Sequence, residues 1–90
     1  MKQFKAIFHG RVQGVGFRYT AERLARHFPV TGTVQNTQHG TVEIVAEGDE
    51  KILQDFLQAI QESPLSSNIS DMNVNWGKAE GKWKSFGIKF

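Results

Sequence analysis

The 90-residue chain has no cysteine, only two prolines and no long hydrophobic run. Without cysteine, disulfides, cysteine-ligated zinc and thiol catalysis are excluded. No apolar run approaches the roughly 20 residues of a membrane-spanning helix, and the N-terminal residues lack the apolar core of a signal peptide. We therefore expect a protein that does not associate with membranes and that resides in the cytoplasm.

The net charge is also small: the chain carries 11 Lys and Arg residues against 9 Asp and Glu residues, a formal net charge of +2. Because no block of basic residues occurs, no nucleic-acid partner is predicted, and a small anion is a better match for one or two well-placed arginines. No spacing among the histidines is typical of a metal site. We interpret them as surface or turn residues: His9, His27 and His39.

The hydrophobic pattern predicts a single α+β domain over residues 1–90. Period-two alternation predicts a strand from about Phe4 to Val12 and further strands near 31–37, 42–47, 69–76 and 83–90. Helical spacing predicts helices at about 17–27 and from Asp49, a candidate cap, to before Pro64. The order β-α-β-β-α-β, with one more short strand, is typical of the ferredoxin-like split βαβ sandwich, in which two helices pack on one face of an antiparallel sheet.

This topology predicts where two strand ends lie. A right-handed crossover makes the first and second strands parallel, with the third strand between them. Their C-terminal ends, near Val12 and Asn36, then emerge at the same edge of the sheet, about 10 Å apart. The first helix begins at that edge as well.

A glycine-rich stretch joins the first strand to the first helix: residues 10–18 read GRVQGVGFR. Gly14 and Gly16 permit the backbone angles that turn successive N–H groups toward one anion, and Arg18 would grip the same anion with its planar fork of donors. The alternative is a tight strand-to-helix turn with Arg18 in solvent. The residues alone leave both interpretations open.

Asn36 is the second candidate. Alternation places it on the same face as Val34, which we expect the helices to cover, so its carboxamide could bind water or a carbonyl near the helix N-terminus. The alternative is an ordinary turn residue, because asparagine often starts hairpin loops.

Together the two stretches resemble a known family. Residues 10–18 resemble the first signature of the acylphosphatases. Residues 32–42, which read GTVQNTQHGTV, and the chain that continues to Gly48 resemble the second signature. The resemblance covers the whole chain. It implies a small, monomeric, metal-independent hydrolase without a cofactor. Its expected substrates are small acyl phosphates, whose carboxyl–phosphate bond is cleaved to release a carboxylate and inorganic phosphate.

The resemblance also implies roles for individual residues. The phosphate would be held by the Arg18 side chain and by backbone amides, those of Gly14, Val15, Gly16, Phe17 and Arg18, while Asn36 would orient the attacking water. A rival hypothesis is a non-catalytic module that binds acyl or carbamoyl phosphate. A second rival is an RNA-binding domain with steeply salt-dependent affinity.

The chain departs from the family pattern at two places. Thr33 occupies a position that is usually aromatic; since it alternates away from Asn36, we expect its effect to fall on packing or solubility. The segment 28–31 lacks the glycine that commonly ends the first helix in relatives. Trp76 and Trp83 flank the basic loop 77–82, and we interpret them as packing residues of a C-terminal hairpin.

Overall fold

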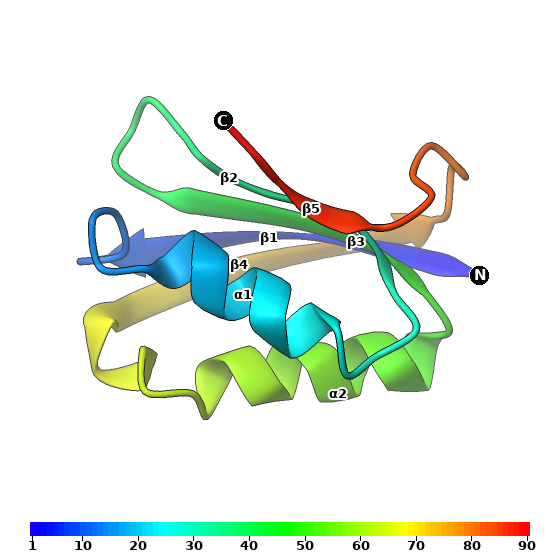
Figure 1. Ribbon diagram of the computed structural model, residues 1–90, viewed down its shortest axis with the longest axis horizontal. Helices are drawn as coiled ribbons and strands as arrows, with labels where there is room; N and C mark the ends of the chain where they lie inside the picture. The colour runs from blue at the N-terminus through cyan, green and yellow to red at the C-terminus, as the bar shows by residue number, and fades with distance from the viewer.

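A computed structural model describes all of residues 1–90, with two helices on one face of a five-stranded sheet (Figure 1). The elements in chain order are β1 (Lys2–Gly10), α1 (Phe17–Ala25), β2 (Thr31–Asn36), β3 (Val42–Gly48), α2 (Glu50–Gln61), a 3-10 turn (Ser66–Asn68), β4 (Ile69–Lys78) and β5 (Phe86–Lys89). The predicted ferredoxin-like α+β fold is confirmed. The predicted strand end at Val12 and helix end at residue 27 were two residues too late.

The strand order is β4-β1-β3-β2-β5, and it corrects two predictions. The pairs β1·β3, β1·β4 and β2·β3 are antiparallel, but β5 runs parallel to β2, so the sheet is not wholly antiparallel. The predicted C-terminal hairpin is wrong, because β4 and β5 lie at opposite edges of the sheet. Trp76 instead packs edge-on against Phe4 in the neighbouring strand, with 5.6 Å between ring centroids.

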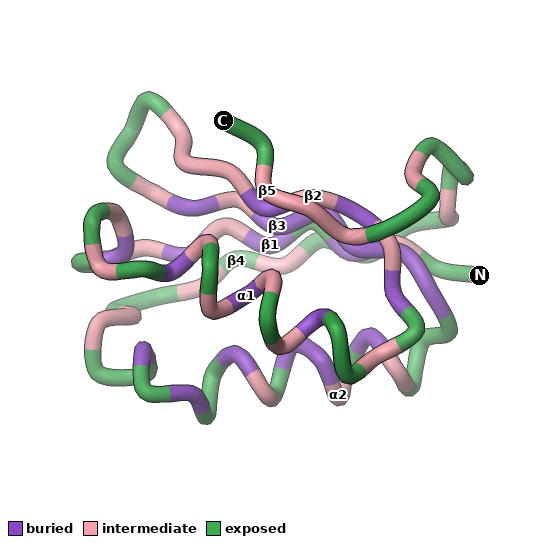
Figure 2. The backbone as a smooth tube through the Cα atoms, viewed as in Figure 1, coloured by how far each residue is buried: buried purple, intermediate pink, exposed green.

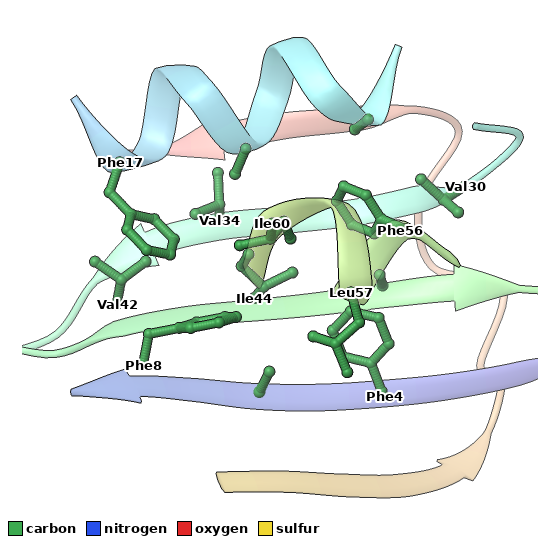
Figure 3. Close-up of a cluster of buried hydrophobic side chains, with 14 of the residues drawn as sticks. Phe4, Phe8, Phe17, Val30, Val34, Val42, Ile44, Phe56, Leu57 and Ile60 are labelled. Carbon is green, nitrogen blue, oxygen red and sulfur yellow. The ribbon is translucent and has the colours of Figure 1, made fainter. Parts of the chain in front are cut away.

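The core lies between the sheet and the two helices (Figure 2). Phe4, Ala6 and Phe8 of β1 are fully buried, as their alternation predicts. The apolar stripe of α2 covers them with four buried side chains, Leu53, Phe56, Leu57 and Ile60. Figure 3 shows Phe56, Leu57 and Ile60 in the cluster with Phe4 and Phe8. Burying each large apolar side chain contributes about 1.5–3 kcal/mol, so this layer is the main stabilising feature.

Phe56 of α2 contacts both the interior strand β1 and the edge strand β5. Its ring lies 6.3 Å from that of Phe4 and 5.5 Å from that of Phe86, between centroids. The second contact anchors the short strand β5 beside β2. Asp49 occupies the predicted N-cap position of α2, but its side chain makes no capping hydrogen bond.

The C-terminal ends of three strands, β1, β2 and β5, lie at the same end of the sheet (Figure 1). Because β1 and β2 are both antiparallel to β3, they are parallel to each other, as predicted. The parallel pairing of β5 with β2 brings Lys89 and Phe90 to the same end of the sheet, beside the end of β2. The loop after β1, the end of β2 and the start of α1 therefore meet there.

The face of the sheet without helices carries a buried carboxylate, Glu47, whose side chain is only 5% exposed. It accepts hydrogen bonds from Gln3 Nε2 at 2.8 Å and from the backbone N–H groups of Glu80 at 2.6 Å and Gly81 at 3.0 Å. Burial raises the pKa of Glu47, but these bonds and the nearby Lys82 charge outweigh burial and hold the pKa below its ordinary value of 4.5. Glu47 thus fastens the β4–β5 connection to β3.

This carboxylate predicts a loss of stability in acid. Since the pKa of Glu47 is lower in the folded chain than in the unfolded chain, its contribution is complete above about pH 4.5 and is lost as pH falls through the folded-state pKa. In urea unfolding from about pH 7 to about pH 3, the stability gap between wild type and Glu47→Gln should therefore shrink as pH falls. The exposed Glu62→Gln provides the control. A gap that stays constant with pH would contradict this role.

Candidate active site

The loop between β1 and α1 depends on two glycines with positive φ. Gly14 has φ 76° and Gly16 has φ 79°, a left-handed conformation that other residues rarely adopt. A Cβ atom at either position would meet nothing within 4 Å, so backbone conformation, not space, requires glycine here. Gly16 is the N-cap residue of α1, and the loop turns directly into the helix.

Side chains and backbone groups hold this loop from two sides. Val12 and Phe17 are buried in the core at its two ends. Between them, Gln13 Nε2 donates hydrogen bonds to the carbonyl oxygens of Thr37 and Thr41, both at 2.9 Å. The loop is therefore fastened to the β2–β3 turn, which also fixes its position relative to the end of β2.

Sequence reasoning missed the role of Gln13. The only signal was a polar side chain between a valine and a glycine, and its partners are backbone carbonyls 24 and 28 residues away in sequence. The other side of the loop is tied by Arg11 N–H, which donates to Asn68 O at 3.0 Å, and by Asn68 Nδ2, which donates to Arg11 O at 3.0 Å.

The backbone amides from Gly14 to Tyr19 have no partners within the chain. Of the 14 backbone hydrogen bonds formed outside the helices and strands, none has its donor between Gly14 and Tyr19. The first bond of the helix runs from Thr20 N–H to Gly16 O at 3.0 Å. No acidic residue occupies the first turn of α1. Unpaired amides at a helix N-terminus, with its partial positive charge, are the usual features of an anion-binding site.

These amides border a pocket of about 180 Å³. Its lining residues are Val12, Gly14, Gly16, Phe17, Arg18, Tyr19 and Asn36. The structure therefore brings Arg18 and Asn36 together, although they lie in different elements. Val15 does not line the pocket; its half-buried side chain packs against the core. The half-buried Asn36 lies at the pocket rather than in the turn.

Arg18 has no carboxylate partner. The ion pairs of the structure involve Arg26, Lys51 and Lys82, and none includes Arg18. Its guanidinium instead lies over the ring of Phe90, with Cζ 5.0 Å from the ring centroid. Sequence reasoning missed Phe90 as well as Tyr19. The planar donors of Arg18 are left available for an anion in the pocket.

The remaining candidates lie outside this pocket. No three His, Asp or Glu side chains form a group that could hold a metal ion. His9 instead pairs with the side chain of Asn73, with 2.7 Å between Nε2 and Oδ1. Neither helix is long and apolar enough to cross a membrane. Thr33 pairs with Val45 of β3 on the helix-free face, as its alternation predicts, and its effect on solubility stays a prediction.

Comparison with known proteins shows which family the chain resembles. The Acylphosphatase family model matches residues 4–88. An acylphosphatase of Bacillus licheniformis is 43% identical over 90 residues, which cover 100% of both chains. The crystal structure of acylphosphatase from Bacillus subtilis has a TM-score of 0.90 and 40% identity, again with 100% of each chain covered.

A larger protein contains a similar unit. The crystal structure of full-length HypF in the phosphate- and nucleotide-bound form matches 100% of this chain and 12% of that chain, at 33% identity and a TM-score of 0.85. The family match extends over nearly the whole sequence, and the full-length relatives carry the same name. The chain therefore belongs to the acylphosphatase family, whose members hydrolyse acyl phosphates.

Proposed function

We propose that the pocket beside α1 carries out the hydrolysis of acyl phosphates. The Arg18 guanidinium and the amides of Gly14 to Arg18 hold the phosphoryl group, and Asn36 places the attacking water. One observation carries this proposal: unpaired loop amides, a guanidinium without a carboxylate partner and an asparagine carboxamide border the same small pocket.

The charges of the pocket suit a phosphoryl group. The transition state of phosphoryl transfer spreads negative charge over the equatorial oxygens, and catalysis consists mainly of positioning and charge stabilisation. Amides whose direction is fixed by Gly14 and Gly16 need little reorganisation as this charge develops. Arg18 adds a full positive charge and two parallel donors.

The bond changes need no strong acid or base from the protein. The oxygen of water forms a bond to phosphorus while the phosphorus–oxygen bond to the acyl group breaks, and the electron pair leaves with the carboxylate. A carboxylate is a weak base and departs without protonation, while a proton of the water passes to solvent. No carboxylate or histidine lines the pocket to act as a general base, so the Asn36 carboxamide contributes by orienting water.

We further propose that the reaction uses neither metal nor cofactor. In many phosphoryl-transfer enzymes Mg²⁺ neutralises the phosphate oxygens. Here Arg18 and the helix N-terminus supply positive charge at the corresponding place.

The proposal extends to the partners and the location of the protein. We propose that residues 1–90 act as one acylphosphatase-like domain and as a monomer in the cytoplasm. The pocket of about 180 Å³ suits a small molecule. The net charge of +2, without a basic block, favours small acyl phosphates over nucleic acid as partners.

Replacing Asn36 with alanine is expected to lower kcat for benzoyl phosphate by about 100-fold, the usual cost of losing one pre-aimed polar group. The inhibition constant of inorganic phosphate should change much less, because the loop amides and Arg18 remain. Steady-state assays with phosphate as a competitive inhibitor measure both quantities. The matched control is Asn75→Ala, an exposed asparagine of β4 on the helix-free face. An unchanged kcat in folded Asn36→Ala would contradict the proposed role.

A further inference from the structure

Two exposed aromatic side chains lie beside Arg18, one of the residues that line the pocket at the start of α1. The exposed large hydrophobic residues of the chain are Met1, Tyr19, Trp76 and Phe90. Two of these four adjoin Arg18: Tyr19 follows it in α1 and lines the pocket, and Phe90 stacks on its guanidinium. Tyr19 is 58% exposed and Phe90 is 86% exposed, so both rings have surface left to cover. The chemistry proposed above for the loop and Asn36 does not use either ring.

The fold explains why these rings meet. Tyr19 lies in the first turn of α1, three residues after Gly16 at the end of the glycine loop. Phe90 follows β5, and the parallel pairing of β5 with β2 carries it to the edge where β2 ends at Asn36 (Figure 1). In the hairpin we expected from the sequence, β5 would lie beside β4 and be separated from β2 by β4, β1 and β3, so Phe90 would lie far from Asn36.

The position of the phosphate directs the rest of the substrate toward these rings. Amides at the base of the loop and the Arg18 guanidinium hold the phosphoryl group inside a pocket of only about 180 Å³. The acyl group must then extend past Arg18, where Tyr19 and Phe90 lie. Apart from Arg18 itself, no charged side chain lines the pocket to pair with a charged acyl group.

We propose that Tyr19 and Phe90 form an acyl-group subsite that favours aromatic and other apolar acyl phosphates over acetyl phosphate. An aromatic acyl group gains by covering apolar ring surface and by stacking, whereas the acetyl methyl group covers little of it. This inference rests on the proposed function, because it concerns the acyl end of the substrate held in the same pocket.

The test is the ratio of kcat/KM for benzoyl phosphate to kcat/KM for acetyl phosphate. Tyr19→Ala and Phe90→Ala are each expected to lower this ratio about tenfold relative to wild type. Tyr19→Phe and Phe90→Tyr, which keep the rings, should retain it within about twofold. Trp76→Ala removes an exposed aromatic from β4 at the far edge of the sheet and should leave the ratio unchanged.

The ratio separates substrate selection from a purely structural role. If the rings only hold Arg18 in place, the alanine variants lose activity on both substrates equally and the ratio stays constant, which would overturn the inference while the proposed function stands. A wild type that turns over neither substrate would overturn the proposed function, and the inference with it.

Discussion

Replacing Arg18 with alanine is expected to lower kcat/KM for benzoyl phosphate by about 1,000-fold or more. Removing one neutral pre-aimed donor costs about 100- to 1,000-fold, and here a full charge disappears as well. Arg18 lines the pocket that we propose binds the phosphoryl group, and its guanidinium has no carboxylate partner that would compete for it. Arg18→Lys should recover part of the loss, since lysine keeps the charge but not the planar fork.

The loss should come from chemistry and not from unfolding. Arg18 is half-buried and forms no ion pair, so its removal should change the free energy of unfolding by less than about 1 kcal/mol. Arg23→Ala is a matched control, because Arg23 is an exposed arginine of the same helix and lies outside the pocket. Circular dichroism and urea unfolding report folding beside the kinetic assay. Activity retained in folded Arg18→Ala would contradict the assignment.

Replacing Gly32 with alanine is expected to lower the free energy of unfolding by about 3 kcal/mol or more. Gly32 lies in β2 between β3 and β5 and has φ 141°, a conformation that strains other residues by about 1–3 kcal/mol. A Cβ atom would also lie 1.8 Å from the carbonyl oxygen of Val45. Because that atom is backbone, relief requires β2 and β3 to separate, which adds about 1–3 kcal/mol.

Urea unfolding of Gly32→Ala tests this prediction, with Gly87→Ala as the control. Gly87 lies two residues from the end of β5, has no positive φ, and an added Cβ would meet nothing within 4 Å. We expect Gly87→Ala to stay within about 0.5 kcal/mol of wild type. Equal stability of the two variants would show that the close approach of β2 and β3 is not rigid.

The central part of the fold could be predicted from periodicity because each element there buries a regular set of side chains. Phe4, Ala6 and Phe8 alternate along β1, and the stripe of α2 repeats at helical spacing. The partner of β5 could not be predicted in this way. A four-residue strand fits the edge beside β4 or the edge beside β2 equally well in its local pattern.

Distant contacts place β5 beside β2. Phe86 packs on Phe56 of α2, and Glu47 of β3 accepts hydrogen bonds from Glu80 and Gly81 in the preceding connection. These residues are separated by about 30 positions in sequence, and a local pattern carries no information on such pairs.

The same distinction applies to the site. That Arg18 and Asn36 lie at one pocket could be predicted, because the crossover of a split βαβ fold places the ends of β1 and β2 at the same end of the sheet. Phe90 could not, since its position follows from the parallel pairing of β5. Gln13 lies within the glycine stretch, but its function depends on the carbonyl groups of the β2–β3 turn.

The most direct test of the account is hydrolysis of benzoyl phosphate by the purified wild-type protein with EDTA present, with inorganic phosphate as inhibitor. We expect turnover that EDTA does not reduce and competitive inhibition by phosphate, because in the proposed mechanism the loop amides and Arg18 supply the charge stabilisation. Phosphate binding without turnover would contradict it and favour a non-catalytic module that holds acyl or carbamoyl phosphate. Turnover that EDTA abolishes would contradict the metal-free mechanism.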